Sequence, residues 1–405
     1  MQKVQIGVCG FVVALLLAGP TLGQDVNQTV INCDRYAASN NDLATTAGRA
    51  GVRFKDLDTE KAKTACEAAY AANPDIARLA FQLARVEVKL GNYERARTLL
   101  EEALAKGYTL AAVELGLLYD TGRGVEADLK KALELYQLAA DAGWGVAYSN
   151  IGDLYRLGLG VEKDEARALE LYNQAIAKGN EAALGRKALM LAGAHQEGDD
   201  PRPVVSALLE AAIRGEAVGS AELGLAYLNG RFGLPVDPVA ASVHLKRGFD
   251  AGDNFGGLYF AIIEMARWDG HFERAEQLRR ALQSIVDSED HENRGPALAL
   301  LGQFGLITGL NRSQVTDLIE RAAQLSPDHH IVLNSRANLL VANGDLAGAD
   351  ALLEKAALAQ PDWAPYYARR SIIQLRLGNA EKSKELETQA NNARDGQYLL
   401  QFIGG

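Results

Sequence analysis

The chain has 405 residues, of which 48% are hydrophobic and 23% charged, and only 10 are proline. This balance excludes a disordered protein, since such chains lack the apolar residues that a core needs. Lys and Arg number 42 against 52 Asp and Glu, so the net charge is −10. An acidic chain argues against a nucleic-acid partner, because phosphates are bound by Lys and Arg. Length alone suggests two or three domains.

The first 23 residues predict a secretory signal peptide. Lys3 supplies the positive start, residues 6–19 are apolar and uncharged, and small residues precede a cleavage site before Gln24. The alternative is an N-terminal membrane anchor, but this apolar stretch is shorter than the ~20 residues that span a bilayer. We therefore expect a periplasmic or secreted protein with no transmembrane segment after cleavage.

Two cysteines, Cys33 and Cys66, remain after the predicted cleavage. An even pair in an oxidising compartment indicates a disulfide. The alternative is a redox-active pair, although such pairs usually have C-x-x-C spacing.

A repeat of 36 residues follows. Residues 111–128 recur at 147–164, including a Leu-Gly-x-x-Tyr segment and a Gly-x-Gly-Val-x-x-Asp turn. A degenerate copy comes next, and residues 223–233 restore the pattern with a turn one residue longer. Apolar residues at i, i+3 and i+4 predict amphipathic helices, and one hairpin cannot bury its apolar stripes alone. The sequence therefore predicts an all-α fold, an α-solenoid of stacked antiparallel helical hairpins.

The repeated small and acidic residues have specific expected roles. Gly116 lies in the middle of a helix, where glycine is unfavourable, so we expect it to let a neighbouring helix backbone approach. Gly122 and Gly124 permit a turn with positive φ. Asp128 and Asp164 are placed to cap the second helix of each hairpin.

The pattern A-x-x-x-L-G-x-x-Y-x-x-G-x-G-V-x-x-D-x-x-K-A resembles the Sel1-like repeat. The flanks resemble the related tetratricopeptide repeat: residues 326–328, Ser-Pro-Asp, recur 34 residues later as Gln-Pro-Asp at 360–362. The block around the two cysteines resembles a segment that precedes such repeats in exported proteins of α-proteobacteria.

These resemblances divide the chain into five parts. We expect a signal peptide at 1–23, a disulfide-linked cap at 24–74, a tetratricopeptide-like and Sel1-like solenoid at 75–287, tetratricopeptide-like repeats at 288–395, and a tail at 396–405. The tail is apolar, so we expect it to fold back on the last hairpin.

No pattern of catalytic residues emerges. The six histidines form no H-E-x-x-H motif, and neither a G-x-S-x-G elbow nor a phosphate-binding G-x-x-x-x-G-K-[ST] loop is present. His329 and His330 are adjacent at an expected helix start, where they would point to different faces rather than share a metal. The sequence therefore predicts no enzyme, no metal and no cofactor.

The first helix of each hairpin is expected to line a concave groove. The tetratricopeptide frame places nine candidate partner-binding residues there: Arg78, Phe81, Arg85, Lys89, Asp120, Asp153, Arg156, Asn334 and Asn338. Arg78, Arg85 and Lys89 share one helix face. This face could contact a ligand carboxylate or a chain terminus, or could simply be solvated.

The resemblance implies a non-enzymatic periplasmic scaffold that binds a protein partner or an extended polymer, with a role in cell-envelope or exopolysaccharide signalling. One alternative is a polysaccharide assembly or export factor, although only 3 tryptophans and no aromatic ladder are available for sugar stacking. A second alternative is a cell-wall hydrolase whose site the motifs miss.

Overall fold

The computed structural model describes residues 22–41, 51–267, 270, 272–288 and 290–402. These residues contain twenty α-helices, three short 3₁₀ turns and no β-strand beyond two isolated bridges, which confirms the predicted all-α class. The predicted signal peptide lies outside the described residues, except that Leu22 and Gly23 begin the first helix. No helix in these ranges is long and apolar enough to cross a membrane.

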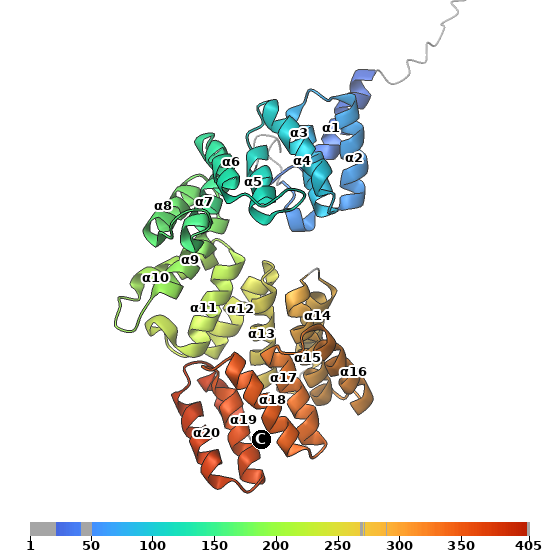
Figure 1. Ribbon diagram of the computed structural model, residues 1–405. Helices are drawn as coiled ribbons and strands as arrows, with labels where there is room; N and C mark the ends of the chain where they lie inside the picture. Colours follow the sequence, from blue (N-terminus) through green and yellow to red (C-terminus); the bar gives the residue numbers. More distant parts are fainter. Residues whose placement is uncertain (1–21, 42–50, 268–269, 271, 289, 403–405) are drawn as a thin grey trace, which may run out of the picture. The chain divides into compact units, whose positions relative to one another are not determined.

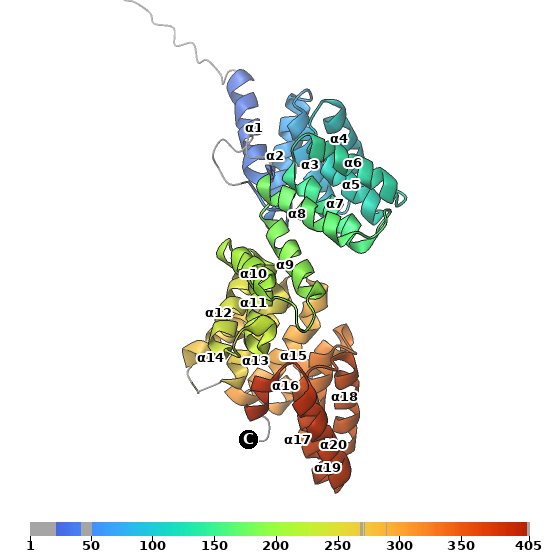
Figure 2. The ribbon, with the colours of Figure 1, turned by 90° about the vertical axis from the view of Figure 1, so that its left-hand side faces the viewer.

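The chain forms two compact units, residues 1–180 and 181–405. The labelled helices of each unit can be followed in Figures 1 and 2. In sequence, the boundary between the two units falls within residues 75–287, which the repeat pattern assigns to one array.

Unit 1 holds eight of the described helices. They are α1 (Leu22–Ala37), α2 (Thr59–Ala72), α3 (Ala77–Lys89), α4 (Tyr93–Ala105), α5 (Ala111–Thr121), α6 (Leu129–Asp141), α7 (Gly145–Leu157) and α8 (Glu165–Ala177), with η1 (Phe54–Asp56) before α2.

Unit 2 holds the other twelve. They are α9 (Ala182–Ala194), α10 (Arg202–Ile213), α11 (Ala217–Asn229), α12 (Pro238–Asp250), α13 (Asn254–Ala266), α14 (Phe272–Asp287), α15 (His291–Thr308), α16 (Arg312–Leu325), α17 (His330–Ala342), α18 (Leu346–Ala359), α19 (Ala364–Arg376) and α20 (Ala380–Asn392), with η2 (Arg231–Gly233) and η3 (Gln397–Phe402).

In both units, consecutive helices pair as hairpins, and each hairpin contacts the next in chain order. The predicted caps and turns are confirmed. The side chain of Asp128 accepts a hydrogen bond from the backbone N–H of Lys131, and Asp164 does the same for Arg167. Gly122 ends α5 at a φ of 67°, a left-handed conformation that glycine adopts without strain.

The mid-helix glycines make room for side chains as well as for backbone. A Cβ built on Gly116 would lie 2.6 Å from the ring of Tyr136, which α6 contributes to the same hairpin. At Gly224 it would lie 2.9 Å from the backbone nitrogen of Leu245. The expected backbone approach therefore occurs at Gly224, whereas at Gly116 the close neighbour is an aromatic ring.

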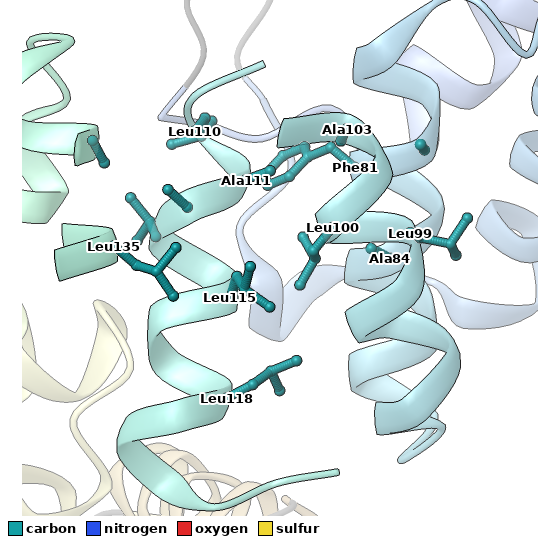
Figure 3. Packing of buried hydrophobic residues seen from close by; sticks show 14 of the residues in the cluster. Phe81, Ala84, Leu99, Leu100, Ala103, Leu110, Ala111, Leu115, Leu118 and Leu135 are labelled. Carbon is teal, nitrogen blue, oxygen red and sulfur yellow. The ribbon is translucent and has the colours of Figure 1, made fainter. Parts of the chain in front are cut away.

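The core of unit 1 is continuous from the N-terminal segment to α8. Figure 3 shows one part of it, where Leu100 of α4 and Leu115 of α5 point toward each other and Phe81 of α3 reaches toward Ala111. Each of these side chains is less than 5% exposed. Because α3, α4 and α5 share this core, the hairpins stack rather than fold separately.

The predicted disulfide is present between Cys33 of α1 and Cys66 of α2, 33 residues apart. Both cysteines are fully buried. The bond joins the two helices of the first hairpin.

The longer turn of the last Sel1-like copy has a distinctive backbone. Phe232 adopts a φ of 56°, the only positive value at a non-glycine position among the described residues. Its ring is 8% exposed and lies edge-on to His195, which follows α9 in the degenerate copy. The extra residue thus inserts an aromatic ring into the neighbouring hairpin.

The C-terminal part of unit 2 packs against its own earlier helices. Tyr259 of α13 and Trp363 meet edge to face, with ring centroids 5.7 Å apart. The backbone N–H of Gly396 donates to the side chain of Asn229 at the end of α11. Leu399 of η3 is buried in the same core. The tail therefore folds back on α19, as predicted, and also contacts α11 and α13.

Candidate functional site

The basic face of α3 contacts the chain's own N-terminal segment. Arg78 pairs with Asp34 of α1 at 3.2 Å. Arg85 is 2% exposed, and its guanidinium donates to the carbonyl oxygens of Ala37 at 2.6 Å and Val52 at 2.9 Å. Burial lowers the pKa of Arg85 below its usual value.

The other two predicted residues of this helix, Lys89 and Phe81, also contact residues of unit 1. The Lys89 ammonium donates to the carbonyl oxygen of Lys55 at 2.7 Å. Phe81 is 1% exposed and packs against the ring of Tyr108, 5.0 Å away. The expectation of an open groove is therefore corrected for two residues: Phe81 is buried against Tyr108, and Arg85 is buried where it bonds to Ala37 and Val52.

The predicted residues in the middle of the array form hydrogen bonds with tyrosines from the second helix of their own hairpin. The Tyr136 hydroxyl donates to Asp120 at 3.2 Å. The Tyr172 hydroxyl donates to Asp153 at 2.7 Å and accepts from Nε of Arg156 at 3.2 Å. Asp120, Asp153 and Arg156 stay half-exposed, so they join the two helices of a hairpin and still reach the surface.

A pocket of about 250 Å³ lies in unit 2 among α13, α15, α17, α19 and η3. We call it the unit 2 pocket. The four helices are the first helices of successive hairpins, and α15 contacts both α13 and α17, so these three helices form one layer. Of the nine predicted residues, Asn334 lines this pocket.

Arg369 of α19 is the charged residue of the unit 2 pocket. Its guanidinium donates to Oδ1 of Asn334 at 2.6 Å and to Oδ1 of Asn338. The two predicted asparagines are thus brought together on one cation. Burial lowers the pKa of Arg369, yet a guanidinium keeps its charge because its ordinary pKa is above 12.

The neighbouring polar groups are neutral. Gln303 donates to the hydroxyl of Ser335, and the hydroxyl of Tyr366 is hydrogen-bonded to Nδ1 of His330 at 2.6 Å. Burial lowers the pKa of His330 to about 3, so this ring is uncharged at neutral pH. His329 caps α17, and His330 is its first residue, as expected for a helix start. Their rings stack with centroids 4.5 Å apart, so the expectation that they point to different faces is wrong.

Sequence reasoning missed Arg369, Gln303 and Trp363 of this pocket. The 34-residue period aligns Arg369 with Ser335, the residue beside Asn334. The repeat period therefore places Arg369 next to a predicted groove position, and this alignment is the signal that could have found it. Gln303 belongs to a hairpin whose repeat pattern is too divergent to assign a frame.

Other sites in the described ranges offer less chemistry. A pocket of about 490 Å³ lies among α6, α7 and α8, but its cation, Arg167, is already paired with Glu170. No group of three His, Cys, Asp or Glu side chains is arranged to hold a metal ion in the part of the chain that the structure describes.

Comparison with known families identifies the repeats. The model of the Sel1 repeat matches residues 109–144, 145–180 and 217–253, and a tetratricopeptide repeat model matches residues 54–113. The unmatched stretch between the second and third Sel1 repeats is the copy that the sequence shows to be degenerate. A search of curated proteins found no match to the chain.

A solved structure shares the fold. The protective antigen c5321 of uropathogenic Escherichia coli strains, which displays an SLR fold, is 16% identical with a TM-score of 0.51, over 95% of this chain and 88% of that chain. A Sel1 repeat protein from Oxalobacter formigenes is 22% identical with a TM-score of 0.46, over 54% of this chain and 91% of that chain.

Proposed function

We propose that this chain, which carries Sel1 and tetratricopeptide repeats, is a non-enzymatic scaffold that binds a protein partner in the groove of its first helices. Repeats of these families typically serve protein–protein interaction rather than catalysis. The observation that carries the proposal is the unit 2 pocket, to which the first helices of four successive hairpins contribute. A surface built from several repeats is the kind that solenoids use for binding.

We further propose that the scaffold works in the periplasm. The buried Cys33–Cys66 disulfide supports an oxidising compartment. The apolar, uncharged residues 6–19 after Lys3 support export through a cleaved signal peptide. A role in envelope or exopolysaccharide signalling, and an extended polymer as the bound partner, remain parts of this proposal.

Site-specific photo-crosslinking tests the location of the groove. A photo-reactive residue at Gln303, which lines the unit 2 pocket, is expected to capture a defined protein from native envelope extract. The matched control is Glu320, an exposed residue on α16, the second helix of the same hairpin. Equal capture from both positions, or none from Gln303, would contradict groove binding.

A further inference from the structure

A cleft in unit 1 lies between two of the second helices. It is the pocket of about 490 Å³ whose floor is α7, where Ile151 is buried and Tyr155 half-buried, and whose walls are α6 and α8. Both walls pack against α7. The lining positions on α6 run from Leu133 to Asp141, which is about 12 Å at 1.5 Å per residue. The cleft therefore follows a helix for two turns, and we call it the unit 1 cleft.

The unit 1 cleft contains a leucine that the stacking of hairpins does not require. Leu138 of α6 lines the cleft and is 44% exposed. The positions 36 residues before and after it are Glu102 and Gln174, on the equivalent helices α4 and α8. A polar residue therefore suffices at this place in both neighbouring hairpins. An exposed leucine that is continuous with the apolar floor of a cleft indicates a surface that another molecule covers.

The charge that remains at the unit 1 cleft is negative. Two of its charged lining residues, Arg167 and Glu134, are each paired with a residue of their own helix. The third, Asp141, accepts a hydrogen bond at 2.7 Å from the neutral amide of Gln137, and no cation pairs with it in the part of the chain that the structure describes. The whole chain also has a net charge of −10. The cleft is therefore complementary to a cationic partner.

We propose that the unit 1 cleft docks an amphipathic helix of a partner protein, which inserts two apolar side chains one turn apart and pairs a lysine or arginine with Asp141. Residues four apart on a helix lie on the same side, with Cβ atoms about 5–6 Å from each other, so two of them fit within the length of the cleft. The docked helix lies along α6 and α8 and covers Leu138. This site is lined mainly by second helices, so it is distinct from the groove of the proposed function.

Binding of a stapled helical peptide to the full chain tests the proposal. The probe is a short alanine-rich helix with two leucines one turn apart and a lysine one turn beyond each of them, so that either orientation brings a lysine to Asp141. One control peptide has serine in place of both leucines, and the other has glutamate in place of both lysines. Fluorescence anisotropy measures each Kd. We expect the probe to bind at least about tenfold more tightly than the serine peptide and at least about twofold more tightly than the glutamate peptide.

Three variants connect the binding to the unit 1 cleft. Leu138→Glu is expected to weaken binding of the probe at least about tenfold, and circular dichroism should show an unchanged fold because the residue is exposed. Leu117→Glu is the matched control, since this leucine is 39% exposed on α5, a first helix, and its replacement is expected to have no effect. Asp141→Lys is expected to reverse the preference, so that the glutamate peptide binds more tightly than the lysine probe.

Several results would overturn the proposal. They are no binding of the probe, equal Kd values for the lysine and glutamate peptides, and full binding by the Leu138→Glu variant. Loss of binding in Leu117→Glu, with Leu138→Glu unaffected, would also overturn it, because the probe would then bind the first helices. Crosslinking from Gln303 tests the groove of unit 2 separately, so neither experiment decides the outcome of the other.

Discussion

Replacing Gly116 by alanine is expected to destabilise unit 1, against the usual effect of this substitution. Alanine favours a helix interior by up to ~1 kcal/mol over glycine, so helix propensity alone predicts stabilisation. The new methyl group, however, would lie 2.6 Å from Cε1 and 2.8 Å from Cδ1 of Tyr136. Carbon atoms in contact are ordinarily ~3.5–4.0 Å apart, so the overlap approaches 1 Å.

The tyrosine ring has little freedom to relieve this overlap. Tyr136 is 0% exposed, and its hydroxyl is bonded to Asp120 on the same helix as Gly116. Overpacking of a well-packed core costs about 1–3 kcal/mol. After the gain in helix propensity of up to ~1 kcal/mol, the free energy of unfolding should fall by up to ~2 kcal/mol.

Urea unfolding of a double-mutant cycle measures the effect. On a Tyr136→Ala background the ring is gone, so Gly116→Ala should become stabilising by up to ~1 kcal/mol. Gly193→Ala in α9 is a second control, because nothing lies within 4 Å of a Cβ built there. If Gly116→Ala stabilises the otherwise natural chain as Gly193→Ala does, the explanation of the repeated glycine is wrong.

Three further outcomes are expected. Reduction of the Cys33–Cys66 bond, which closes a 33-residue separation, should lower the free energy of unfolding by about 3–4 kcal/mol, and the Cys33→Ala, Cys66→Ala double variant should lose this sensitivity to reductant. Asp350→Asn should cost about 2–4 kcal/mol in urea unfolding, since the side chain of Arg370 is only 6% exposed, whereas Asp200→Asn should leave the free energy of unfolding nearly unchanged because its pair with Arg202 is on the surface. The pKa of His330 is about 3 when folded and about 6.5 when unfolded, so between these values the unfolded chain binds a proton that the folded chain does not. Stability relative to a His330→Gln variant should therefore be about 2 kcal/mol smaller at pH 5 than at pH 7, and an unchanged difference would contradict a neutral, buried ring.

The repeats could be predicted because their signals are local. Asp128 and its turn glycines act on residues within one or two helical turns, so their roles follow from spacing alone. The hairpin that contains Gly224 was similarly readable despite its longer turn. Prediction of the disulfide required only the number of cysteines and the expected oxidising compartment.

The groove could not be predicted at the same level, because its contacts join residues far apart in the chain. The guanidinium of Arg85 donates a hydrogen bond to the carbonyl oxygen of Ala37, 48 residues earlier in the chain. No local sequence pattern predicts that contact. Arg369 is held in place by hydrogen bonds to Asn334 and Asn338 in the preceding hairpin. Register within a repeat shows which face a residue occupies, but not which distant segment fills that face.

The bond between Gly396 and Asn229 has a consequence for how unit 2 comes apart. In an open array the terminal repeat touches a single neighbour, so it frays first and exchanges its amide hydrogens fastest. Here the last hairpin and the tail also contact α11 and α13, through packing of Trp363 and Leu399 and through this hydrogen bond. Amide protection should consequently be retained in α19 until the whole of unit 2 opens, which makes this helix one of the most persistent parts of the unit.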